Sequence, residues 1–131
     1  MGDSLDDRQR DDRVGDENLP PRLAEDRFYR ALAASQRRRL LYYLLAEEES
    51  YVDELATVLG GWNATATGTM HTSADRSELR LTLVHNHLPL LTEAGLIDYN
   101  PQDGTVQIAP LHPRVADIIR WSITAEQRLE P

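Results

Sequence analysis

The sequence predicts a mainly helical fold with one small β-hairpin and a long helix at its C-terminal end. Apolar residues recur at three- and four-residue spacing from Asp75 to about Glu93, which predicts an amphipathic helix. Alternating apolar and polar residues on both sides of a turn-forming loop then predict a hairpin over about 96–108. A final amphipathic stretch follows Pro113. A long helix that runs directly into a hairpin is the second half of a winged helix-turn-helix.

The helix predicted over residues 75–93 has recognisable ends. Asp75 and Glu78 form a capping-box pattern at its start, and Gly95 ends it. Pro89 has no N–H to donate to the carbonyl of residue 85, so we expect a bend there. The spacing predicts one apolar stripe, Leu81, Val84, Leu88 and Leu91, and a second stripe, Leu79, Leu83 and Leu90.

Three helices are expected before this one. The first begins near Asp26 and the second covers about 35–48. The third begins with a capping-box pattern at Ser50 and Asp53 and is expected to end at Gly60-Gly61. Residues 60–74 show no periodicity and predict an inserted loop, where a helix-turn-helix usually has a turn of three or four residues.

The length of 131 residues is sufficient for one domain, which we place at residues 23–128. Residues 1–22 are rich in aspartate and arginine and carry few apolar side chains. Such a segment cannot bury enough surface to offset its ordering entropy, so we expect a disordered acidic tail. An acidic interaction tail is the alternative.

The composition is acidic and lysine-free. The chain has 22 acidic residues and 14 arginines, for a formal net charge of -8. This balance fits a cytosol of molar salt, where charges are screened within about 3 Å; a genome of high GC content is the alternative explanation. Molar salt removes most of the electrostatic attraction to DNA for any protein, so the net charge does not exclude DNA binding. The sequence shows neither a membrane span nor a signal peptide, and we expect a cytoplasmic protein.

The run from His87 to Tyr99, HLPLLTEAGLIDY, resembles the junction between recognition helix and wing in ArsR-like winged-helix regulators. With proline after His-Leu it is most similar to a family of small winged-helix proteins of halophilic archaea. The runs Phe28–Ala33 and Arg37–Leu44 are similar to the opening helices of the same families. The likeness covers residues 26 to about 126 and implies a winged helix-turn-helix.

We therefore expect a DNA-binding transcriptional regulator whose partner is double-stranded DNA. The helix over 75–93 would enter the major groove, and the hairpin tip would lie along the backbone. On this basis the candidate DNA-binding residues are Arg76, Arg80, Thr82, His85, Asn86 and Gln102. The alternative is a winged-helix interaction module that docks another protein through apolar helix faces and residues 60–74, and never binds DNA.

A homodimer is the expected assembly. The terminal helix carries an apolar face and an additional tryptophan, and the resemblance implies dimerisation through terminal helices. The candidate interface residues are Phe28, Ile118, Ile119, Trp121 and Ile123. A terminal helix that only covers its own domain is the alternative.

The three arginines Arg37, Arg38 and Arg39 lie in the first turns of a predicted helix, close to its positive end, and should have an anionic partner. The partner can be DNA phosphate, or acidic residues of the same chain or of a dimer mate.

The sequence gives no sign of catalysis or of a bound cofactor. No nucleophile, base and orienting partner occur at a motif-like spacing, and there is no glycine-rich phosphate loop. The chain has no cysteine, which excludes disulfides and zinc-thiolate sites. His85 and His87 project in different directions from a regular helix, so we predict no metal site.

Overall fold

The computed structural model describes residues 26–129, so the predicted acidic tail lies outside the described residues. The order of elements is α1 (Asp26–Ala31), α2 (Ser35–Glu47), β1 (Glu49–Tyr51), α3 (Val52–Thr67), α4 (Ser73–Thr82), the π-helical turn η3 (Leu83–His87), α5 (Leu88–Glu93), β2 (Ile97–Asn100), β3 (Thr105–Ile108) and α6 (Pro113–Leu129). The predicted fold class, mainly helical with a hairpin wing and a long terminal helix, is confirmed. Within residues 26–129, no helix is both long and apolar enough to cross a membrane.

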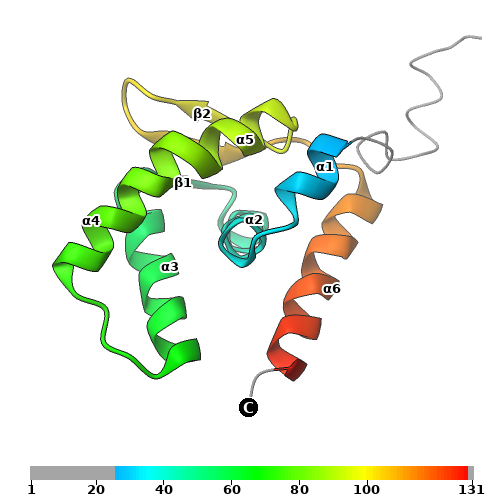
Figure 1. The fold of residues 1–131 in the computed structure, drawn as a ribbon. Coiled ribbons are helices and arrows are strands. Elements are labelled where there is room, and N and C mark those ends of the chain that lie inside the picture. Colours follow the sequence, from blue (N-terminus) through cyan, green and yellow to red (C-terminus); the bar gives the residue numbers. More distant parts are fainter. Residues whose placement is uncertain (1–25, 130–131) are drawn as a thin grey trace, which may run out of the picture.

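Helix α2 occupies the centre of the domain (Figure 1). In this view α2 is seen end-on, α3 and α4 lie to its left, α6 lies to its right, and α5 with the sheet lies above it. The core consists of aliphatic side chains from these elements, led by Leu40, Leu41 and Leu44 of α2, all of which are fully buried. Because α2 contacts α3, α6 and the sheet, it holds the helix-turn-helix and the terminal helix together.

The sheet has three antiparallel strands in the order β1-β3-β2, and β1 was not predicted. Its middle residue Ser50 pairs with Val106. The capping box predicted at Ser50 is wrong, because strand pairing extends the backbone through Tyr51 and α3 begins only after it. The Ser50 hydroxyl instead donates to Glu54 Oε1 at 2.7 Å.

Helix α3 does not end at Gly60-Gly61, and the loop predicted over 60–74 is wrong. The helix continues to Thr67 and ends at Gly68, which adopts a left-handed conformation with φ +74°. The ring of Trp62 meets that of Tyr42 edge-on with centroids 6.0 Å apart, and the Arg39 guanidinium lies 5.3 Å from the Trp62 ring. These contacts hold the second half of α3 against α2. Because α3 extends to Thr67 and α4 begins at Ser73, only residues 68–72 connect the two helices.

The two adjacent glycines of α3 have different surroundings. A Cβ atom at Gly60 would collide with the imidazole ring of His71, whereas one at Gly61 would meet nothing within 4 Å. The connection after α3 therefore folds back so that His71 packs on the helix backbone. Gly60 permits this close approach and does not act as a helix stop.

The helix predicted over 75–93 is present but begins earlier and contains a π-helical turn. Its cap is Thr72, whose side chain accepts from the Asp75 N–H at 3.1 Å while Asp75 Oδ2 accepts from the Thr72 N–H at 3.0 Å. The box predicted from Asp75 to Glu78 is therefore displaced by one turn. Directly before Pro89, the Leu88 N–H donates to the carbonyl of Leu83, five residues back.

The π-helical turn changes which leucines face the core. Leu81, predicted to be buried, is 57% exposed, whereas Leu83, Leu88 and Leu91 are buried. The turn adds one residue between Leu83 and Leu88, so both can face inward at a spacing of five. Val84, also in the predicted stripe, is half-buried.

The predicted dimer interface is wrong for three of its five residues. Phe28 and Ile123 are each 1% exposed and Ile119 is 0% exposed, because all three face the chain's own core. Ile118 is half-buried and Trp121 is exposed. These last two remain on the surface of the domain.

The three consecutive arginines find their partners within the chain. Arg37 donates to the carbonyls of Ala31 and Arg30, at the end of α1. Arg39 pairs with Glu126 Oε2 at 2.7 Å, and Arg38 lies 3.5 Å from Glu126 Oε1. The cluster therefore joins α1, α2 and α6. Its positive charge has partners within the chain, so DNA phosphate is not needed to balance it.

Candidate nucleic-acid interface

The helical segment α4–η3–α5 and the wing border two adjoining hollows, which we call the wing cleft. The smaller hollow, about 350 Å³, lies between α3, α4 and the wing tip. The larger hollow, about 980 Å³, lies between η3, α5, the wing and the first two helices. Tyr99 and Pro101 of the wing line both hollows.

Four of the six predicted DNA-binding residues line the wing cleft. Arg80 and Gln102 line the smaller hollow, and His85 and Asn86 line the larger one. The structure thus places residues from α4, η3 and the wing tip around a common depression. The sequence indicated His85 and Asn86 through the outward face of a helix, Arg80 through its place toward the start of that helix, and Gln102 through the tip of a hairpin.

Arg80 is the only predicted DNA-binding arginine that lines the wing cleft in the described part of the chain. Its Nε lies 2.6 Å from Asp53 Oδ1, and its side chain is 47% exposed. The hydrogen bond and charge of Arg80 hold the pKa of Asp53 below its usual value. Within residues 26–129 the two terminal nitrogens of Arg80 have no hydrogen-bond partner. Asp53 therefore fixes the guanidinium and leaves its outer edge available.

Arg76 and Thr82 do not line the wing cleft. Arg76 Nε donates to Thr57 Oγ1 at 2.9 Å and its Nη2 donates to the carbonyl of Asp53 at 3.2 Å. Arg76 therefore fastens α4 to α3. Thr82 donates to the carbonyl of Glu78 at 3.1 Å and lines a different cavity.

The wing tip is ordered by its own side chains. Asn100 Oδ1 accepts from the Gln102 N–H at 3.0 Å, and Asp103 Oδ1 accepts from the N–H and hydroxyl of Thr105. The Thr105 hydroxyl and N–H hold the pKa of Asp103 below its usual value. Gly104 has φ +76°, which a side chain would strain. The tip is thus a defined turn that carries a carboxylate.

The electrostatics of the smaller hollow are mixed. Asp53 and Asp103 line it together with Arg80, so its carboxylates exceed its cations. Leu81 adds a large exposed apolar side chain to α4. Such a surface attracts phosphate weakly, and specific contacts by Arg80 and Asn86 would have to carry more of any DNA affinity.

His87 separates the larger hollow from the cavity on the other side of α4, because it lines both. Its Nδ1 lies 3.2 Å from Arg37 Nη1, and it accepts a hydrogen bond there because a guanidinium only donates. Burial, and secondarily the charge of Arg37, lower the pKa of His87 from 6.5. The ring is therefore neutral in the folded chain and serves packing, as expected for a structural histidine.

We expect the stability of the protein to fall as the pH drops below 6.5, in part because of His87. Below that pH the unfolded chain binds a proton at His87 that the folded chain excludes, whereas above it both states are neutral and the contribution is complete. Denaturant titrations from pH 7.5 to 5 should show a shallower loss of stability for His87→Asn, whose amide oxygen can accept from Arg37 without titrating. Equal slopes in wild type and variant would contradict this assignment.

Comparison with known proteins identifies a family but not a function. Residues 29–107, from α1 to β3, match a family described as a domain of unknown function, DUF7344. No curated protein and no solved structure matches the chain significantly. The match covers more than half of the 131 residues and includes the helix-turn-helix and the wing. The chain therefore belongs to the DUF7344 family.

Proposed function

We propose that this protein binds double-stranded DNA through its winged helix and acts as a transcriptional regulator. The observation that carries the proposal is the position of Arg80 in the wing cleft, where Asp53 holds its Nε, its side chain is 47% exposed and its terminal nitrogens bond no described residue. A guanidinium fixed in this way is suited to phosphate or to the O6 and N7 atoms of guanine. Gln102 lines the same hollow, so one DNA segment can contact both helix and wing.

Helix α4 supports this proposal by its exposure. None of its ten residues is buried, and it is held mainly by Arg76, Arg80 and the half-buried Leu79. A helix that projects from the domain in this way can enter a major groove. The resemblance to ArsR-like regulators points in the same direction.

We further propose a homodimer in a salt-rich cytoplasm. Trp121 is 70% exposed on α6, and Ile118 lies one turn before it. In Figure 1, α6 lies on the opposite side of α2 from α4, so an interface on α6 leaves the wing cleft open. Light scattering at the working salt concentration tests this; a monomer would remove the role proposed for α6.

The function is tested by genome-wide occupancy of the tagged protein, crosslinked at native salt, beside an Arg80→Ala/Asn86→Ala variant. We expect sharp peaks that share a twofold-symmetric sequence and that disappear in the variant. Each lost specific contact should weaken binding by about 1–3 kcal/mol. The matched control is Arg120→Ala/Gln127→Ala, which removes an arginine and a side-chain amide from the exposed surface of α6. Peaks that survive the Arg80 and Asn86 changes would show that the groove assignment is wrong.

The larger hollow supports an alternative function, the binding of a protein partner. Val84, Pro89, Leu90, Tyr99 and Pro101 give it a partly apolar lining, which suits a protein partner better than phosphate. A flat occupancy profile from a folded, abundant protein would favour an interaction module over a DNA-binding protein.

A further inference from the structure

The outward side of α4 carries a leucine that has no part in the contacts proposed above. Leu81 is 57% exposed, although leucine is among the side chains that folding most often buries. With about 100° per residue, it projects about 160° away from Leu79 and from Leu83, two residues on either side of it. Leu79 packs against the core and Leu83 is fully buried. Leu81 therefore points almost directly away from the core.

Short, uncharged side chains accompany Leu81 on the outward side of α4. Ala74 and Ser77 precede it at spacings of seven and four residues, and both are exposed. The three residues lie in a line along the helix, which we call the outer ridge. Glu78 lies beside this ridge and lines the cavity on the side away from the wing. The outer ridge itself places no carboxylate between α4 and an approaching DNA duplex.

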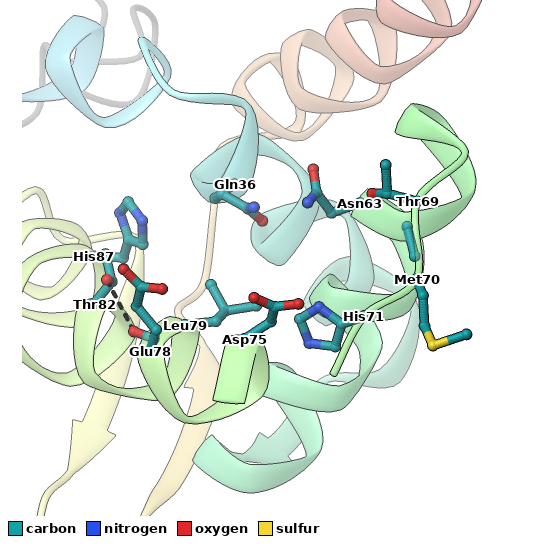
Figure 2. A pocket seen from close by; sticks show the side chains of 11 residues that line it. Gln36, Asn63, Thr69, Met70, His71, Asp75, Glu78, Leu79, Thr82 and His87 are labelled. Atoms are coloured by element: carbon teal, nitrogen blue, oxygen red, sulfur yellow. Dashed lines mark hydrogen bonds between the residues drawn. The ribbon is translucent and has the colours of Figure 1, made fainter. Parts of the chain in front are cut away.

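The two residues adjacent to Leu81 in the sequence are held by the protein. Thr82 donates to the carbonyl of Glu78 at 3.1 Å and lines the cavity between α4 and α2 (Figure 2). On the other side, Arg80 Nε lies 2.6 Å from Asp53 Oδ1 in the wing cleft. Thr82, a candidate for DNA contact from the sequence, is thus turned away from the outer ridge. Leu81 is the large apolar group that adjoins the fixed guanidinium.

The chemistry of leucine restricts what Leu81 can recognise in DNA. Its side chain has neither a donor nor an acceptor, so it cannot bond a phosphate or the polar edge of a base. It gains free energy only by covering apolar surface. Among the four unmodified bases, thymine alone presents a methyl group in the major groove, and apolar side chains read it by contact. A leucine on the outer ridge is therefore suited to thymine.

We propose that Leu81 is a specificity-determining residue that packs on the C5-methyl group of a thymine, next to the base pair or phosphate that Arg80 contacts. This inference rests on the proposed function and names one base of the sequence that the protein recognises. Arg80 supplies hydrogen bonds and charge, whereas Leu81 supplies an apolar contact. Salt does not screen an apolar contact, so this part of the selectivity persists in the salt-rich cytoplasm proposed above.

The test begins with the selection of duplexes from a random-sequence pool by the full chain at molar salt. In the selected duplex each thymine is then replaced, one at a time, by deoxyuridine, which lacks only the C5-methyl group. Fluorescence anisotropy gives the affinity for each duplex. We expect at least one thymine whose replacement weakens binding of the wild type by about fourfold, as for one buried methyl group. In Leu81→Ala the same replacement should leave the affinity unchanged, because the shorter side chain does not reach the methyl group.

Two further variants serve as matched controls. Leu81→Met keeps an apolar side chain of similar volume, so it should keep the discrimination between thymine and deoxyuridine. Leu129→Ala removes a leucine that is 85% exposed at the end of α6, and it should bind every duplex as the wild type does. Alanine is favourable at an exposed helix position, so Leu81→Ala should keep its fold, which circular dichroism checks.

Failure of this inference is distinct from failure of the proposed function. If a duplex is selected but no thymine methyl group affects its affinity, Leu81 does not read thymine, although the protein still binds DNA. The same holds if the loss on replacement by deoxyuridine is equal in the wild type and in Leu81→Ala. If no sequence is enriched from the pool, the DNA-binding function fails and the thymine contact fails with it. That last result is expected if a protein partner covers Leu81.

Discussion

Replacing Glu126 by alanine is expected to lower the free energy of unfolding by about 3 kcal/mol or more. Glu126 Oε2 lies 2.7 Å from Arg39 Nε, and the two side chains are only 11% and 7% exposed. Removal of the carboxylate takes a close anionic partner from a buried guanidinium and a more distant one from Arg38. Because the pair joins α6 to α2, the loss should also loosen the terminal helix.

Chemical denaturation at fixed salt measures this effect, and α6 supplies a matched control. Asp117 pairs with Arg120 at 3.4 Å on the open surface, where the side chains are 75% and 55% exposed. Asp117→Ala should therefore change the free energy of unfolding by less than about 1 kcal/mol. If both variants lose the same stability, burial does not strengthen the Glu126 contact as argued here.

A single methyl group at Gly60 is expected to destabilise the protein, whereas the same group at Gly61 should stabilise it. Alanine in a helix interior is favoured over glycine by about 1 kcal/mol, which is the gain expected for Gly61→Ala because its Cβ meets open space. At Gly60 the Cβ collides with the His71 ring. Overpacking of this kind costs about 1–3 kcal/mol, which offsets the gain.

A double variant separates the collision from other effects. In a His71→Ala background the ring is absent, so Gly60→Ala should become as stabilising as Gly61→Ala. The free energies of the four chains in this cycle give the coupling between the two positions, measured by thermal or denaturant unfolding. A coupling near zero would mean that His71 does not pack on Gly60 in solution.

The elements that the sequence predicted correctly are those set by local chemistry. Alternating residues and the turn around Gly104 are sufficient to predict the hairpin, and proline at the first position is sufficient to start α6. The failures involve contacts between distant residues. The pair Gly60-Gly61 resembles a helix stop in the sequence, which does not show that Gly60 makes room for the His71 ring. Strand β1 was missed because it forms by pairing of Ser50 with Val106, 56 residues later (106 − 50).

In the candidate site too, features set by one helix were predicted, and features set by contacts between elements were missed. A helical wheel was sufficient to place His85 and Asn86 outward, and Arg80 was chosen because it lies toward the helix start, but neither argument could show that Asp53 fixes Arg80 from another helix. It also could not detect the π-helical turn, which moved Leu81 to the surface. The cavity that Thr82 lines was missed because its lining comes from α2, α3, the connection 68–72, α4 and η3, and no pattern within one of them signals it.

The attachment of the wing to the helix-turn-helix determines how this protein can adapt to a partner. The Val52 N–H donates to the carbonyl of Gly104 at the wing tip, and the Ile108 N–H donates to the carbonyl of Glu48 at the wing base, each at 3.0 Å. Strand β3 is thus bonded along its length to the segment before α3, and the wing cannot swing as a separate arm. Little conformational entropy is then lost on association, but the cleft keeps a fixed width. Under the proposed function, the duplex and not the protein adjusts to this width, so sequence-dependent flexibility of the DNA would contribute to selectivity at base pairs that the protein never touches.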